Sequence, residues 1–277
     1  MLGFSKLATD GAGLGNQMFR YAALKGIASR RGLSFCIPSM EKMSRAFILN
    51  APIFPEFRGQ TYTEISHGFD ENFVLNCPED ADLSGYFQTE KYFKHIEQEI
   101  RKDFSFRSTI TEEAYPSQEF IALHARRGDY TVLGNYHPLC SVEYYETALS
   151  LLDPSLPVYV FSDDPEWCKN TFADARFRFV VCRERKIHNV SRGFFVNMIQ
   201  EDTYRRAIIV RDDISSLYLM TKATQFICAN STFSWWGAWL AKDKSKVIFP
   251  KRWFGTANGH LDTKDLCYMS GVDFRAV

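Results

Sequence analysis

The sequence predicts an α/β protein made of two Rossmann-like domains that face a central cleft. From residue 120 onward, short apolar runs alternate with helical patterns, which indicates a parallel sheet covered by helices. A strand–helix–strand pattern also opens the chain, and the polar stretch 107–118 separates the two halves. We therefore expect an N-terminal domain over residues 1–112 and a C-terminal domain over residues 113–277. Ligands in such sheets bind beyond the carboxyl ends of the strands.

The N-terminal half is expected to begin with a β-α-β unit. Residues 1–8 have the pattern of a strand, and residues 9–16 form a glycine-rich turn. Apolar side chains then recur four residues apart, which predicts a helix that ends at Gly32, and residues 33–38 predict a second strand. Residues 39–100 hold aromatics and prolines without a clean period, so we expect mixed short elements there.

The C-terminal half alternates strands and helices regularly. Ser141 is expected to cap one helix, and Pro165 suits the first turn of another. Strands are expected at residues 120–124, 157–162, 176–181, 225–229 and 246–250. Helices are expected at residues 141–152, 165–172, 213–223 and 233–241 and, in the N-terminal half, at residues 88–104.

Composition argues against several classes of protein. Lysine plus arginine and aspartate plus glutamate each number 33, so the net charge is zero, whereas nucleic-acid-binding proteins usually carry a basic excess. The seven cysteines form no C-x-x-C pair, which disfavours a disulfide framework or a structural zinc site. No apolar run approaches the roughly 20 residues of a membrane span, and no signal peptide is evident. We expect a cytoplasmic protein; its oligomeric state is not predicted.

The sequence GAGLGN at residues 11–16 is close to a dinucleotide-binding fingerprint. That fingerprint requires glycine or alanine at its sixth position, where this chain has Asn16, so a nicotinamide oxidoreductase is disfavoured. Gly13 and Gly15 still open a helix N-terminus, whose free N–H groups attract anions. Asn16 and Gln17 would add polar side chains at the cleft. The alternative is a tight turn with satisfied polar caps.

A D-x-D spacing occurs at Asp80 and Asp82. Some sugar transferases hold a divalent metal with this spacing, but here it follows a proline, with no strong strand before it. We therefore expect a solvated acidic turn and no metal site.

A second acidic pair follows the strand expected at residues 157–162. Ser162 and Asp163 lie where a doubly wound sheet places its ligand contacts. A carboxylate there can accept hydrogen bonds from a guanine edge or a ribose hydroxyl. Asp164 is expected to cap the next helix, and capping is also the structural alternative for the whole segment.

The stretch ANSTFSWWGAWLA, residues 229–241, follows a strand and opens a helix. Asn230, Ser231, Thr232 and Ser234 offer amide and hydroxyl groups beside the free N–H groups of the helix. This arrangement predicts a phosphate-binding site. The tryptophans that follow are expected to pack the helix against the sheet.

The stretch HARRGDY, residues 124–130, occupies the loop after the first strand of the C-terminal half. One arginine can bind a phosphate with two hydrogen bonds, while the other can pair with Asp129. The alternative is a purely structural Arg–Asp pair. Arg127-Gly128-Asp129 is also an adhesion tripeptide, which would need an exposed loop tip in a secreted protein. The cysteine pattern and the absence of a signal peptide argue against that role.

Taken together, four motifs resemble the α-1,2-fucosyltransferases of glycosyltransferase family 11, the blood-group H type and its bacterial relatives. They lie in the expected order at residues 11–22, 124–130, 161–167 and 229–254. The resemblance implies a GT-B fold and transfer of L-fucose from GDP-fucose, with inversion, to the 2-hydroxyl of a galactose-containing glycan. It also implies no metal and no cofactor. A transferase on the same fold that uses another nucleotide sugar is the alternative.

The resemblance also implies roles for particular residues. Arg126 and Arg127 would hold the donor diphosphate, and His124 and Asp163 would face the guanosine. The other donor-site residues would be Ser231, Thr232 and Phe233 at the helix N-terminus, and Gly15, Asn16 and Gln17 on the other domain.

Catalysis would depend on the arginines, which stabilise the leaving GDP, and on a base for the acceptor hydroxyl. Asp129 is the first candidate for the base by its position, and its rival role is to orient Arg127. The chain departs from the family at Ala125, where relatives commonly carry valine. Animal members carry a membrane anchor that is absent here, so a bacterial or viral member is expected. The least-matched N-terminal domain leaves the acceptor open.

Overall fold

The computed structural model divides the chain into two compact units. It describes residues 1–9, 12–111, 115, 117–182, 207–266, 268–270 and 273–277. One unit comprises Met1–Glu113 with Thr256–Ser270, and the other comprises Ala114–Gly255 with Gly271–Val277. Residues 256–270, which the sequence assigns to the C-terminal domain, thus belong to the first unit.

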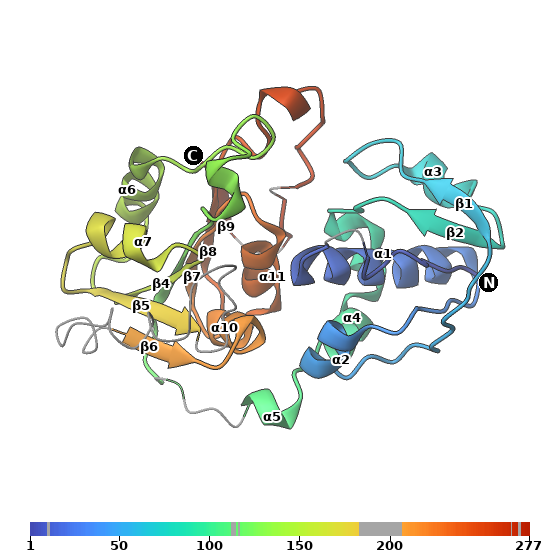
Figure 1. The fold of residues 1–277 in the computed structure, drawn as a ribbon, viewed down its shortest axis with the longest axis horizontal. Helices are drawn as coiled ribbons and strands as arrows, with labels where there is room; N and C mark the ends of the chain where they lie inside the picture. The colour runs from blue at the N-terminus through green and yellow to red at the C-terminus, as the bar shows by residue number, and fades with distance from the viewer. Residues whose placement is uncertain (10–11, 112–114, 116, 183–206, 267, 271–272) are drawn as a thin grey trace. The chain divides into compact units, whose positions relative to one another are not determined.

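The first unit is organised on the long helix α1, Leu14–Arg31 (Figure 1). As predicted, α1 ends at Gly32, whose φ of 63° lies in the left-handed region that glycine adopts without strain. The two strands expected beside α1 are largely wrong. They are reduced to isolated parallel bridges, such as Leu2 with Phe35, because consecutive residues bond to different segments. Leu2 bonds to the backbone of residues 34 and 36, whereas Gly3 bonds to that of residues 81 and 83.

Short elements complete the first unit, as the mixed pattern of this region predicts. The helix expected at residues 88–104 is broken at Phe93, whose ψ of 4° departs from helical geometry. The elements are α2 (Glu41–Ala46), β1 (Gln60–Thr63), α3 (Glu71–Leu75), β2 (Ala81–Ser84), η1 (Glu90–Tyr92), η2 (Lys94–Ile96), α4 (Glu97–Asp103), α5 (Ser108–Thr111) and η4 (Thr256–Asn258). Strands β1 and β2 pair in parallel.

The D-x-D segment corrects one expectation. Asp82 does not lie in a solvated turn but in β2, where its carboxylate accepts hydrogen bonds from the main-chain N and the Oγ of Ser5 at 2.7 and 2.6 Å. Asp80 is exposed. Asp82 therefore secures the N-terminal segment against β2.

The second unit is built on a parallel sheet of seven strands in the order β6-β5-β4-β3-β7-β8-β9. Five of them confirm the predicted strands, whereas β6 and β9 were not predicted. The strands are β3 (Ile121–Ala125), β4 (Val158–Ser162), β5 (Phe177–Cys182), β6 (Ala207–Val210), β7 (Gln225–Ile227), β8 (Lys246–Phe249) and β9 (Asp273–Ala276).

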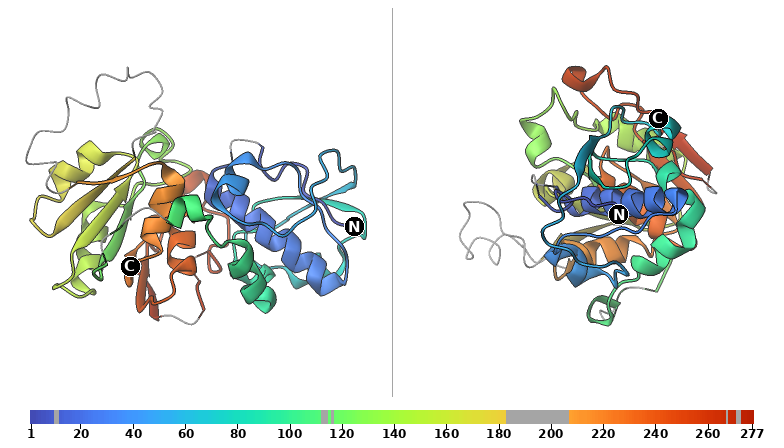
Figure 2. Two further views of the ribbon diagram at one scale, coloured as in Figure 1. Left: turned by 90° about the horizontal axis from the view of Figure 1, so that it is seen from below. Right: turned by 90° about the vertical axis from the view of Figure 1, so that its right-hand side faces the viewer.

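Helices cover both faces of this sheet, with α6 and α7 on one side and α10 and α11 on the other (Figures 1 and 2). The expected caps are confirmed, since Ser141 Oγ accepts from the N–H of Tyr144, and Asp164 accepts from the N–H of Trp167. The elements are α6 (Val142–Ser150), α7 (Pro165–Thr171), α10 (Asp213–Met220), α11 (Thr232–Leu240) and η3 (Asp129–Thr131).

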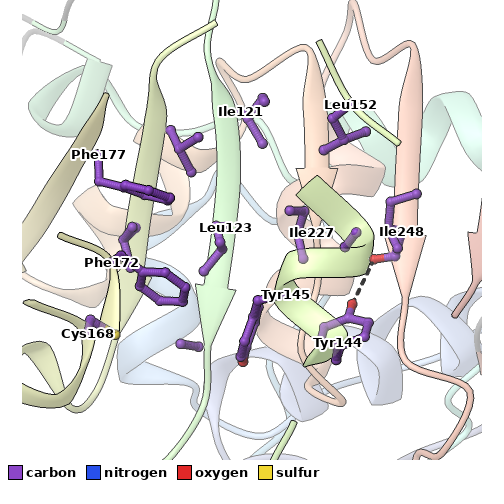
Figure 3. Close-up of a cluster of buried hydrophobic side chains, with 14 of the residues drawn as sticks. Ile121, Leu123, Tyr144, Tyr145, Leu152, Cys168, Phe172, Phe177, Ile227 and Ile248 are labelled. Atoms are coloured by element: carbon purple, nitrogen blue, oxygen red, sulfur yellow. Dashed lines mark hydrogen bonds between the residues drawn. The ribbon is translucent and has the colours of Figure 1, made fainter. Parts of the chain in front are cut away.

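The core of the second unit lies between α6, α7 and the sheet (Figure 3). Tyr145 packs beside Leu123. The Tyr144 hydroxyl donates to the main-chain oxygen of Cys228 at 2.5 Å and lies 3.4 Å from that of Ile248. Alternate residues of a strand face opposite sides, so His124 faces away from this cluster. In α11, the indole rings of Trp235, Trp236 and Trp239 are buried against one another, as expected of packing residues.

The strand order creates a topological switch point between β3 and β7. From β3 the chain moves outward through β4, β5 and β6, and it then returns to β7 on the other side of β3. All seven strands are parallel, so the loops that follow β3, β4 and β7 leave the sheet at the same, carboxyl-terminal end of the strands. Ligands of doubly wound sheets bind at this end of the strands, where the strand order reverses.

Two further expectations can be compared with the described residues. No helix among them is long and apolar enough to cross a membrane. The six cysteines that the structure describes, Cys36, Cys77, Cys140, Cys168, Cys182 and Cys228, are free thiols. Cys267 lies outside the described residues.

Candidate functional site

An arginine–aspartate cluster lies at the switch point of the second unit. Arg126 follows β3, and Asp163 follows β4. The Nη1 of Arg126 donates to Oδ2 of Asp163 at 2.6 Å, and its Nη2 donates to Oδ1 of Asp129 at 2.5 Å. The Arg126 side chain is 32% exposed and that of Asp129 is 51% exposed, whereas that of Asp163 is only 7% exposed. One guanidinium therefore bridges a buried and an exposed carboxylate.

The buried carboxylate of Asp163 joins the ends of two strands. Its Oδ1 accepts from the main-chain N–H of Arg127 at 2.7 Å, while its Oδ2 accepts from Arg126. A Cβ atom at Gly128 would lie 2.5 Å from Oδ2, so only glycine allows this approach. A buried carboxylate is costly unless it is paired and hydrogen-bonded, and this network provides both. A contact of Asp163 with guanosine stays a prediction.

Arg127 is fastened to the start of α7. Its Nε donates to Oδ2 of Asp164 at 3.1 Å, and its guanidinium lies 4.0 Å from the centre of the Trp167 ring. The expectation that Asp129 orients Arg127 is wrong, because η3 places Asp129 against Arg126 instead. Among the described residues, the ion pair of Arg127 is with Asp164, and its side chain is only 17% exposed.

The end of β4 is joined to β3 by a second contact. Ser162 Oγ donates to the main-chain oxygen of Ala125 at 2.7 Å and accepts from the N–H of Asp164 at 2.9 Å. The predicted ligand residue Ser162 therefore holds the fold at this point. His124 lies at 5.6 Å from Phe233, ring centre to ring centre, which brings β3 and the first turn of α11 together.

The loop between β7 and α11 contains the predicted phosphate-binding residues. The buried Asn230 donates from Nδ2 to the main-chain oxygens of Pro138 and Trp253 at 3.0 and 2.9 Å, so its amide hydrogens hold neighbouring loops. Ser231 caps α11 by accepting from the N–H of Phe233, and Thr232 is the first residue of the helix. The positive end of the α11 helix dipole, and not the Asn230 amide, is therefore the feature of this loop that attracts an anion.

Tyr130 connects this loop to the arginine cluster. Its hydroxyl donates to the main-chain oxygen of Asn230 at 3.2 Å, and its ring lies 5.2 Å from the Arg126 guanidinium carbon. Burial raises the pKa of Tyr130 to about 12, so the hydroxyl keeps its proton. The His137 ring stacks on the Tyr130 ring with centres 4.8 Å apart, and burial lowers the pKa of its imidazole.

The sequence pattern predicts no role in the site for Tyr130, His137 and Trp167. Tyr130 shares a motif with the arginine pair, which is a usable signal for cation–π packing, whereas the motif of Trp167 contains no arginine. His137 lies outside every motif, so only the folded chain identifies it.

The first unit contains the glycine-rich motif. Gly13 caps α1 without a side-chain hydrogen bond, and Gly15 lies in the first turn. Asn16 Oδ1 accepts from Nε2 of Gln88 at 2.9 Å. The buried Gln17 donates from Nε2 to the main-chain oxygen of Ala12 at 2.8 Å. Among the described residues, nothing bonds to its Oε1 atom.

A strained turn adjoins Gln88. The backbone has positive φ at Gly85, 151°, and at Phe87, 52°, and the latter is costly for a residue with a large side chain. Glu64 holds this turn, because its Oε2 accepts from the N–H groups of Tyr86 and Phe87 at 2.8 and 2.9 Å. Burial raises the pKa of Glu64 to about 7.

The structure thus gathers the predicted residues into two groups, one in each unit. Within the part of the chain that the structure describes, no three His, Cys, Asp or Glu side chains are grouped to hold a metal ion. The expected independence of metal stays a prediction.

Comparisons with known proteins agree on one family. The model of the family described as Glycosyl transferase family 11 matches residues 37–184, more than half of the chain. The chain is 26% identical to the alpha-1,2-colitosyltransferase of Escherichia coli, over 87% of this chain and 90% of the relative. It is also 26% identical to the galactoside 2-alpha-L-fucosyltransferase of Caenorhabditis elegans, over 87% of this chain and 69% of the relative.

A solved structure shares the fold. NodZ alpha-1,6-fucosyltransferase of Bradyrhizobium, in a crystal soaked with GDP-fucose, aligns with a TM-score of 0.51 over 90% of this chain and 94% of NodZ. The sequences are 12% identical in this alignment, so the likeness is one of fold. It supports the α/β architecture with a parallel sheet.

The Glu64 contact generates a prediction about stability and pH. The folded-state pKa of about 7 exceeds the ordinary value of 4.5, so between these pH values the folded chain binds more protons than the unfolded chain. The free energy of unfolding of the wild type therefore falls as the pH rises through this window. Glu64→Gln keeps an acceptor oxygen but does not titrate. Relative to wild type, it should gain up to about 3 kcal/mol between pH 4.5 and pH 8.

Urea unfolding of both proteins at pH 5 and pH 8 measures this difference. Glu56→Gln is the control, because its carboxylate is 83% exposed. If the gain of Glu64→Gln over wild type is the same at both pH values, the buried carboxylate does not titrate in this window.

Proposed function

Because the chain belongs to glycosyl transferase family 11, we propose that it transfers L-fucose from GDP-fucose to the 2-hydroxyl of a galactose-containing glycan, with inversion at C1. The two relatives named above, which are alpha-1,2-transferases of colitose and fucose, support the linkage and the class of sugar. We also propose the GT-B arrangement of two Rossmann-like domains facing a cleft, a cytoplasmic location, and catalysis without a metal or cofactor.

The observation that carries the proposal is the arginine cluster at the switch point of the second unit. Arg126 lies at the carboxyl end of β3, and Tyr130 connects it with the loop that opens α11. A diphosphate at this end of the sheet would meet the Nη2 group of Arg126 and the positive end of the α11 helix dipole. This combination suits a leaving group with concentrated negative charge.

The charges of the cluster define how the donor binds. Arg126 and Arg127 are opposed by Asp129, Asp163 and Asp164, which gives 2 − 3 = −1 formal charge before a ligand arrives. A diphosphate would therefore have to displace one carboxylate. Asp129 is the most exposed of the three and contacts the Nη2 atom of Arg126, so we propose that the donor replaces Asp129 on Nη2 while Asp163 stays on Nη1.

This exchange would give Asp129 two successive roles. It neutralises Arg126 in the free protein, and once the diphosphate has displaced it, its carboxylate can accept the proton of the acceptor hydroxyl. The acceptor oxygen then forms its bond to C1 of fucose as the bond from C1 to the diphosphate oxygen breaks. The electron pair leaves with GDP, where Arg126 stabilises the charge.

The donor sugar has one alternative worth testing. The name of the Escherichia coli relative points to colitose, so a GDP-linked colitose is a second candidate donor. The adhesion tripeptide is disfavoured, because the Arg127 side chain is 17% exposed and is bound to Asp164.

The class of donor is tested by ligand-induced thermal stabilisation and by product analysis. GDP and GDP-fucose should raise the melting temperature, whereas UDP-galactose and NAD should not. Incubation with GDP-fucose and lactose should yield a fucosylated trisaccharide. Stabilisation by UDP or NAD without stabilisation by GDP would overturn the proposal. A donor preference for GDP-linked colitose would replace fucose with the alternative sugar.

The two roles of Asp129 generate a second prediction. Asp129→Asn removes the charge that competes for Arg126, so the dissociation constant of GDP should fall, by roughly threefold to tenfold. Turnover should fall by about 10²-fold or more because the base is lost. The measurements are GDP titration by calorimetry and initial rates at saturating substrates.

A control variant separates the role of Asp129 from the general effect of removing a surface charge. Arg58→Ala removes one exposed charge from the other unit and should alter neither quantity. A variant Asp129→Asn that bound GDP more weakly and kept its turnover would show that Asp129 only orients Arg126.

A further inference from the structure

We propose that the turn Gly85–Gln88 of the first unit is the sugar-binding part of the acceptor site, with the ring of Tyr86 stacking against a neutral pyranose. The identity of that sugar, a galactoside, rests on the function proposed above. The turn itself is defined by contacts within the first unit.

The turn presents one aromatic ring to solvent and buries its neighbours. Tyr86 is 44% exposed, whereas Phe87 and Gln88 are buried. Phe87 contacts the rings of Phe4 and Tyr92 at centre distances of 5.8 and 5.3 Å. The strained backbone thus exposes one aromatic side chain and buries the next. Such strain persists only where the surrounding structure enforces it, and it is concentrated at functional sites.

The buried side chain of Arg20 holds the exposed Tyr86 ring in place. The buried Arg20 donates from Nε to the main-chain oxygen of Gly85 at 3.0 Å and from Nη1 to that of Lys6 at 2.9 Å. Its guanidinium carbon lies 5.4 Å from the centre of the Tyr86 ring. With Glu64 holding the N–H of Tyr86, both sides of this peptide unit are fixed. A ring fixed in this way loses little entropy when a ligand stacks on it.

The surroundings of the ring suit a neutral polyhydroxyl ligand. The His67 ring lies 5.8 Å from that of Tyr86, with 30° between their planes, and burial lowers the pKa of His67, so its imidazole is neutral at pH 7. The Gln88 amide follows in the same turn and bonds to Asn16 at the start of α1. A pyranose offers a face of C–H groups for the ring and hydroxyls for these neutral polar groups.

Kinetics of the full chain with GDP-fucose and lactose test the proposal. Tyr86→Ala should raise the KM for lactose about fivefold to tenfold, the loss expected for one aromatic stacking contact, without changing the KM for GDP-fucose. Tyr86→Phe restores the ring and should recover most of this loss. Phe54→Ala is the control, because Phe54 is a similarly exposed aromatic residue of the same unit, at 52%.

Direct binding separates this proposal from the proposed function. Saturation-transfer NMR with methyl β-D-galactoside and lactose should show ring-dependent binding to the wild type that weakens in Tyr86→Ala. Such binding without any fucosyl transfer would leave the subsite standing and overturn the proposed reaction. An unchanged lactose KM in Tyr86→Ala, a rise only in the KM for GDP-fucose, or no galactoside binding to the wild type would overturn the subsite.

Discussion

The candidate donor site depends on the buried carboxylate of Asp163. It accepts from the Arg126 side chain and from the Arg127 main chain, so one residue after β4 fixes the loop after β3. Gly128 permits the contact because any Cβ there would collide with the carboxylate. Since a buried carboxylate must keep its partners, this interaction fixes where Arg126 can lie. The outer half of the guanidinium, which contacts the exposed Asp129, is the part that can change partner.

The sheet topology gives this interaction its place. The reversal of strand order between β3 and β7 puts the Arg126 loop beside the loop that opens α11, and the contact from Tyr130 to Asn230 joins them. A guanidinium and a helix N-terminus then share one edge of the sheet, an arrangement suited to a diphosphate. In the first unit, a strained turn holds an exposed tyrosine. These two features support the proposal that the second unit binds the donor and the first unit binds the acceptor.

The sequence predicts the second unit well, because its strands and helices are regular and their caps have clear signals, as at Ser141 and Asp164. It misses β6, a run of four residues between charged segments, and it overextends the first strands, where tertiary contacts leave only single bridges. The motifs name the site residues but not their partners. Asp129 pairs with Arg126, and Asn230 bonds to two loops. Both contacts depend on distances in the folded chain that no local sequence pattern specifies.

If Asp163 positions Arg126 for the donor diphosphate, replacing it with asparagine must weaken the binding of GDP. Asparagine matches the shape of aspartate but provides no charge, so Arg126 would be less firmly held and more strongly paired with Asp129. Calorimetric titration should then give a GDP dissociation constant at least about tenfold above that of the wild type, the equivalent of 1.4 kcal/mol or more. An affinity equal to that of the wild type would show that Asp163 does not position Arg126 for the donor.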